Sequence, residues 1–171
     1  MKISILKLLT SIAAAGLAIC SATPALSQAT DTATSMITLQ FNENIIIQNV
    51  DPVTISDPTP GTPAIGSDRF CVAGSGFSTY SITFQNNGTD PSFSIVGSGG
   101  VSISYDMLYE NDGQVPVTVV AGAPIPNNIL QATNCSDDNA TFDIIIPENE
   151  WEPNQAFAPF TGTLLITVES E

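Results

Sequence analysis

Hydrophobic and polar residues alternate along most of the chain, and Gly, Pro, Asn or Asp interrupts each alternating run. A period of two residues is typical of short β-strands with one buried face, and no stretch shows a convincing 3.6-residue helical period. The pattern predicts strands within residues 36–41, 45–55, 70–72, 80–84, 93–95, 101–107, 115–120, 140–146 and 161–168. Short strands that recur about every ten residues favour an all-β protein built as a β-sandwich.

The first predicted strand differs from the others in its position. It carries Ile37, Leu39 and Phe41 on one face, follows a Thr- and Ala-rich stretch, and is separated from the next strand by polar Asn42 and Glu43. It is either an ordinary edge strand of the same domain or a strand that pairs with another molecule. The second interpretation requires an acceptor sheet with an exposed edge and a hydrophobic groove, which proteins normally avoid.

Residues 1–27 have the organisation of a secretory signal peptide. Lys2 and Lys7 precede about a dozen mostly apolar residues, too few to span a membrane, and small residues follow. Cleavage is expected after Ser27, with Ala29 as the alternative position. Lipidation at Cys20 is the weaker interpretation, because the preceding isoleucine is bulky. The sequence therefore predicts an exported protein.

The chain is strongly acidic, with 17 Asp and Glu residues against three Lys and Arg, and a net charge of −14. Removal of the two signal-peptide lysines shifts the charge to −16 and leaves Arg69 as the only cation among 144 residues. This length suits one domain. An acidic surface repels phosphate backbones and anionic membranes, so nucleic-acid binding is excluded.

Cys71 and Cys135 are the two cysteines that follow the predicted signal peptide. In an exported protein such a pair is most simply a disulfide, which would stabilise the fold by about 4 kcal/mol. The alternative is two free thiols or half of a metal site, although zinc prefers sites with histidines or more cysteines.

Few residues could support catalysis, because the chain has no histidine and no lysine after the signal peptide. Paired carboxylates of a glycosidase remain the enzymatic alternative, and the candidates are Asp106 with Glu110, or Glu148 with Glu150 and Glu152. Solvated acidic loops explain these residues better. We therefore expect a protein that is not an enzyme and needs no cofactor.

A binding function is the other alternative, in which residues 35–41 pair within a self-complete sandwich. Asp137 with Asp138, or residues 110–113, could bind calcium, although neither has helix-loop-helix spacing. Trp151, in a charged turn, could contribute to a sugar-stacking surface with Tyr80, Tyr105 and Tyr109. Tyr105 is in phase with neighbouring apolar residues, so core packing explains it better.

Five segments occur in an order that carries a family resemblance. They are SMITLQF at 35–41, GTDPSFSI at 88–95, ISYDMLY at 103–109, IIIPEN at 144–149 and FTGTLLITV at 160–168. Together with the signal peptide, this order resembles the pilin subunits of chaperone–usher fimbriae, especially the archaic branch and the spore coat protein U domains. The likeness spans about residues 35–169.

The resemblance implies an incomplete immunoglobulin-like sandwich at 44–171 that lacks its last strand, preceded at 28–43 by an extension with a donor strand. A periplasmic chaperone would first fill the gap, and the donor strand of the next subunit would replace it at an outer-membrane usher. Ile37, Leu39 and Phe41 would be the donor side chains, and Leu164, Ile166 and Val168 would line the groove. The product would be a fimbria on the cell surface, with a surface ligand that the sequence does not identify.

Overall fold

The computed structural model describes residues 33–86 and 92–171. The predicted signal peptide lies outside these residues. The chain divides into two units, Met1–Thr38 and Leu39–Glu171. In the first unit the described residues, 33–38, contain no helix or strand.

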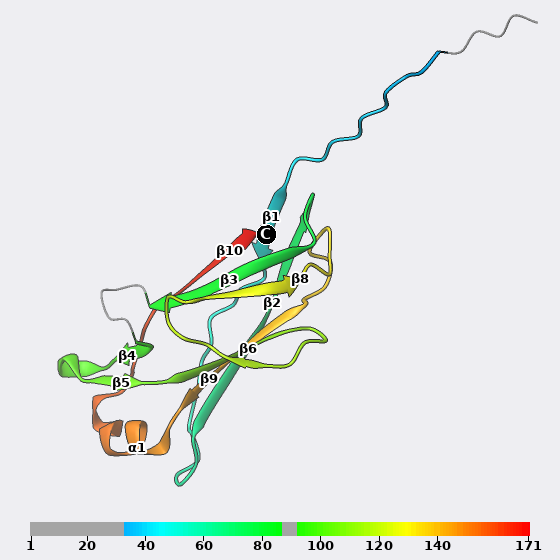
Figure 1. Ribbon diagram of the computed structural model, residues 1–171. Helices are drawn as coiled ribbons and strands as arrows, with labels where there is room; N and C mark the ends of the chain where they lie inside the picture. Colours follow the sequence, from blue (N-terminus) through cyan, green and yellow to red (C-terminus); the bar gives the residue numbers. More distant parts are fainter. Residues whose placement is uncertain (1–32, 87–91) are drawn as a thin grey trace, which may run out of the picture. The chain divides into compact units, whose positions relative to one another are not determined.

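The second unit is a sandwich of antiparallel sheets (Figure 1). One sheet has the strand order β1-β2-β9-β6-β7, the other has the order β10-β3-β8, and β4 with β5 forms a small third sheet. In the described residues the strands are β1 (Asn44–Gln48), β2 (Ala64–Ser75), β3 (Thr79–Asn86), β4 (Ser94–Val96), β5 (Ser102–Ser104), β6 (Asp106–Asn111), β7 (Val117–Thr118), β8 (Pro124–Ile129), β9 (Ala140–Ile146) and β10 (Leu164–Ser170). The predicted all-β sandwich is confirmed.

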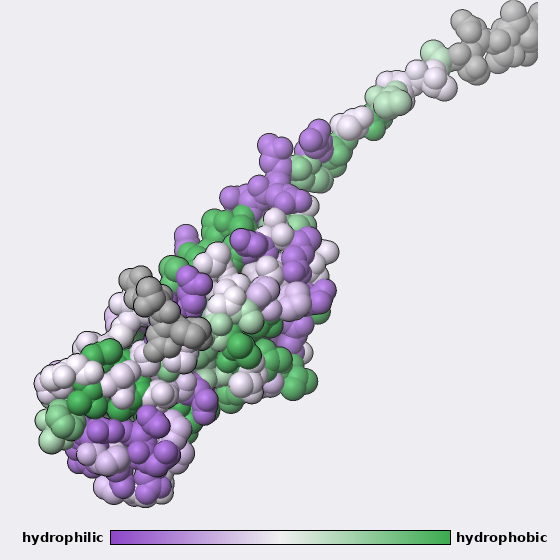
Figure 2. Space-filling model, turned by 60° about the vertical axis from the view of Figure 1, so that its left-hand side comes forward, coloured by the Kyte–Doolittle hydropathy of each residue, from purple (hydrophilic) through white to green (hydrophobic). Residues whose placement is uncertain are grey.

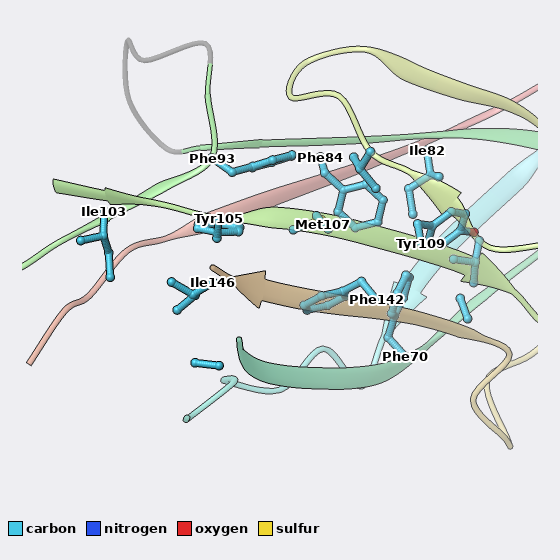
Figure 3. Close-up of a cluster of buried hydrophobic side chains, with 14 of the residues drawn as sticks. Phe70, Ile82, Phe84, Phe93, Ile103, Tyr105, Met107, Tyr109, Phe142 and Ile146 are labelled. Carbon is cyan, nitrogen blue, oxygen red and sulfur yellow. The ribbon is translucent and has the colours of Figure 1, made fainter. Parts of the chain in front are cut away.

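Aromatic and aliphatic side chains fill the space between the two main sheets (Figure 3). Phe84 of β3 lies 5.4 Å from Tyr109 of β6 and 6.1 Å from Phe142 of β9, measured between ring centroids. All three side chains are buried, and tilted or edge-on aromatic pairs of this kind add to the burial energy. Apolar side chains of β3, β6 and β9 therefore meet in one core.

Several predicted strands occur close to their expected positions. The predicted strand at 140–146 coincides with β9, the one at 80–84 lies inside β3, and β10 begins three residues later than predicted and extends beyond it. Each is rich in β-branched or aromatic residues and carries apolar side chains at every second position, which fits a half-buried pleated strand.

Other strand predictions were wrong. The segment 115–120 contributes only the two residues of β7, and β8 was missed because its two prolines and two asparagines mark a turn rather than a strand. Residues 53–55 form no strand, although Val53 and Ile55 pack against the core. Their side chains fill the space above Gly66 of β2, where a Cβ atom would lie 2.6 Å from Val53.

The helical part of the described chain is short. It comprises α1 (Glu148–Trp151), η1 (Ser98–Gly100) and η2 (Glu152–Phe157). In the described residues no helix is long and apolar enough to cross a membrane.

Cys71 and Cys135 form the predicted disulfide, with an S–S distance of 2.04 Å and a Cα–Cα distance of 5.6 Å. Cys71 lies in β2 and is fully buried, whereas Cys135 lies in the loop that leads into β9. The disulfide therefore fastens the loop that precedes β9 to β2, and β2 is also the strand with which β9 pairs.

A polar contact crosses the core between the two sheets. The hydroxyl groups of Tyr80 in β3 and Tyr109 in β6 lie 2.9 Å apart, and the Tyr80 hydroxyl also donates to Asn111 Oδ1 at 3.4 Å. Burial raises the pKa of Tyr109 far above its ordinary value, and the neighbouring Tyr80 raises it further. Burial also raises the pKa of Tyr80.

Because the pKa values of Tyr80 and Tyr109 are raised by burial, we expect the protein to lose folding stability at high pH. Their pKa values lie above the ordinary value of 10.0, so above that pH the unfolded chain releases protons that the folded chain retains. The free energy of unfolding should therefore be maintained below pH 10 and fall as the pH rises further. Urea unfolding at pH 8 and pH 11 measures the fall, and Tyr109→Phe should make it smaller. An equal fall in both proteins would contradict this origin.

Candidate functional site

β10 is an edge strand of the three-stranded sheet. Along seven residues it pairs with β3, from Leu164 opposite Asn86 to Ser170 opposite Tyr80, and in the described residues no strand pairs with its other side. Leu164, Ile166 and Val168 pack against the core but remain partly exposed. A sandwich normally covers such inward-facing positions, so the core is incompletely closed along β10.

The same three residues direct their peptide groups away from β3. The amide of Glu171 donates to the carbonyl of Thr79 in β3 at 2.9 Å, so the backbone groups of residue 171 point toward β3. Because backbone groups alternate along a strand, residues 165, 167 and 169 face β3, and residues 164, 166 and 168 face the free edge. Residues 164, 166 and 168 thus each supply two things: an apolar side chain that packs on the core, and backbone groups that could pair with a further strand.

β1 forms the second free edge on this side of the sandwich. It pairs with β2 alone in the described residues and lies next to β10. Ile45 and Ile47 of β1 also pack on the core while remaining partly exposed. These two residues were not predicted to line the groove, although the run of three isoleucines shortly after the predicted donor strand was a usable signal.

The opposite edges of the two sheets are poor acceptors for a strand. β7 has two residues, and β8 contains Pro124 and Pro126, which lack amide protons, and Asn127 with a φ of 60°. Prolines and irregular backbone at an edge prevent pairing with another strand. Of the outer edges of the two main sheets, those of β10 and β1 are therefore the regular, proline-free ones.

The predicted donor side chains are largely exposed in this single chain. The exposed fractions are 92% for Ile37, 78% for Leu39 and 68% for Phe41, and residues 33–43 form no strand. The strand expected at 36–41 is thus not formed within the chain. Its formation on a second molecule stays a prediction.

Exposed apolar residues also occur elsewhere on the body, and Figure 2 shows hydrophobic patches between hydrophilic ones. A small pocket of about 170 Å³ lies on the side of β7 and β8. It has no charged lining residue, and its members are Tyr109, Asn111, Gln114, Val115, Val117, Ile125, Pro126 and Asn128. The amide groups of Asn111 and Asn128 already donate to the Ile129 carbonyl at 3.0 Å and the Tyr80 carbonyl at 3.1 Å. These bonds connect strands, so the amide donors serve the fold.

The proposed sugar-stacking surface is wrong. Trp151 is buried, and its Nε1 donates to the Thr62 carbonyl at 3.2 Å, so it fastens α1 to the loop before β2. Tyr80, Tyr105 and Tyr109 are buried as well. Aromatic rings inside the core present no face to a ligand.

Three of the acidic residues considered as catalytic or calcium-binding candidates hold neighbouring segments of the chain together. Glu150 Oε2 accepts from the Ser104 amide at 3.0 Å, and Glu152 Oε1 accepts from the Gly61 amide at 2.8 Å. Asp112 forms an ion pair of 2.9 Å with Arg69. Across the described ranges no three Asp, Glu, Cys or His side chains are grouped as metal ligands.

The fold is similar to that of a chain in a solved chaperone–tip adhesin complex, described as vital for synergistic activation of CFA/I fimbriae biogenesis. The TM-score is 0.53 at 20% sequence identity, and the match covers 75% of this chain and 42% of the other. This chain thus corresponds to less than half of that one. No family model matches the sequence, and the search of curated proteins gives no match. The similarity supports the predicted immunoglobulin-like class of sandwich, of the kind present in a fimbrial complex.

Proposed function

We propose that the protein is a non-catalytic structural subunit of a surface fimbria, assembled by donor-strand exchange through a chaperone–usher pathway. In this proposal the domain is an incomplete sandwich of the archaic or spore coat protein U type. The free edge of β10 is the acceptor site, and residues 35–41, here called the donor segment, supply the missing strand to another copy.

The observation that carries the proposal is the match between the edge of β10 and the donor segment. β10 has seven residues with inward apolar side chains at Leu164, Ile166 and Val168. The donor segment also has seven residues, with Ile37, Leu39 and Phe41 at the same spacing of two. Strand addition would satisfy the free backbone groups of β10 and bury both apolar rows.

The expected strength of such a contact is high. Full burial of one large apolar side chain contributes about 2 kcal/mol, and each net backbone hydrogen bond adds about 1 kcal/mol. Three donor side chains and a row of hydrogen bonds would therefore give long-lived contacts between subunits.

The proposal also defines partners and location. The chain would pass through the periplasm bound to a chaperone whose strand occupies the β10 edge, reach an outer-membrane usher, and join neighbouring pilin subunits on the cell surface. No nucleic acid takes part, because the net charge of −14 opposes contact with phosphates.

A gel comparison tests the proposal. Protein sheared from the source cells is divided into an unboiled and a boiled sample, both with the disulfide intact, and separated in SDS. We expect a ladder of polymers in the unboiled sample and one band near the mature mass after boiling. A single monomer band in both lanes would contradict strand exchange and favour a self-complete domain.

A further inference from the structure

The connection between the donor segment and the sandwich is packed tightly on the body. Gly76 has a φ of +91°, and a Cβ atom there would lie 3.0 Å from the Asn42 carbonyl oxygen and 3.0 Å from Glu43 Cα. Both neighbours are backbone atoms, which cannot rotate away as a side chain can. Residues 42–43 therefore lie directly on Gly76, with no space for a side chain between them.

A hydrogen bond joins the same connection to the end of the acceptor strand. Ser170 Oγ, in the last residue of β10, donates to Glu43 Oε2 at 2.8 Å. The following residue, Glu171, is itself held, because its carboxylate accepts from the Asn127 amide at 2.9 Å and its amide donates to Thr79. The base of the donor segment is thus tied to a fixed strand end.

We infer that residues 42–43 form a rigid mount for the donor segment, with Gly76, Glu43 and Ser170 as its positioning residues. This inference rests on the proposed function, because a mount for the donor segment has a role only if that segment pairs with another copy. A flexible linker would let consecutive subunits adopt many orientations, whereas a fixed two-residue connection sets one exit direction. The bond between Ser170 and Glu43 also joins the acceptor strand of each copy to the base of its own donor segment. In a fibre, a pulling force would pass from one copy to the next through these two elements.

Backbone ¹⁵N relaxation of the full exported chain tests the mount. All variants in this experiment also carry Leu39→Asp. This substitution blocks polymerisation if the proposed function is right and has no effect on the oligomeric state if it is wrong, so every sample is monomeric. In this parent we expect order parameters of about 0.85 at residues 42–43, and values below about 0.6 after Gly76→Ala. Gly122→Ala is the matched control, since Gly122 has a φ of +74° and no atom within 4 Å of the added Cβ.

Comparison of Gly76→Ala with Gly122→Ala separates the loss of a contact from backbone strain. Both glycines have left-handed φ values, but only Gly76 contacts residues 42–43. Ser170→Ala is a second variant without backbone strain, and it should also lower the order parameters at residues 42–43. Disordered residues 42–43 in the parent, or equal values in all variants, would overturn the mount. Ordered residues 42–43 together with a monomer band for the unmodified chain would uphold the mount and refute the proposed function.

Discussion

Leu39→Asp is expected to abolish the heat-sensitive polymer ladder while the sandwich remains folded. Leu39 is 78% exposed and lies in no strand of its own chain, so its replacement removes little from the stability of the monomer. In the proposed polymer the same position is buried against the edge of the next copy. The loss of about 2 kcal/mol of apolar burial is then accompanied by the larger cost of burying an unpaired carboxylate.

Gln40→Asp is the matched control for this variant. It places the same negative charge one residue further along, on the face of the donor segment that alternates away from Leu39. This variant should still form the ladder on unboiled gels. A ladder of normal length from Leu39→Asp would mean that the donor segment does not assemble the protein.

The sequence predicted strands well where apolar residues occupy every second position. The predicted strand at 140–146 coincides with β9, because each inward residue is apolar and each end is marked by a turn or a proline. β8 was not predictable in this way, since Pro124, Pro126 and Asn127 have strong turn preferences. Its place depends on pairing with β3 across a β-bulge, which is a tertiary effect.

The candidate site was partly predictable. Leu164, Ile166 and Val168 were identified as groove residues from the resemblance to pilin subunits, which their alternation fits. Alternation alone does not show that β10 lies at an edge, since edge position depends on the neighbours of a strand. Trp151 was a candidate for surface contact because acidic residues surround it in sequence, but in α1 its ring is buried. The contacts of residues 42–43 with Gly76 and Ser170 join positions far apart in the chain and leave no local signal.

Ile166→Asp is expected to abolish acceptance of a donor segment while donation continues. Ile166 faces the core from the middle of β10 and is partly exposed, so an added strand would cover it and bury the new carboxylate. Leu165→Asp is the matched control, because Leu165 is the adjacent residue, is 46% exposed and belongs to the opposite face of the strand. On unboiled gels the control should still form the ladder, and thermal melts should show that both variants fold.

The two defective subunits should complement each other in a single direction. Leu39→Asp retains its acceptor edge, and Ile166→Asp retains its donor segment, so a refolded mixture should yield a heat-sensitive dimer and no longer species. Each dimer would expose only a defective donor and a defective acceptor, because head-to-tail contacts between copies are heterologous and need both parts to continue. Either variant alone should remain monomeric. A full ladder from the mixture, or no dimer although both variants fold, would contradict the assignment of β10 and the donor segment to one contact.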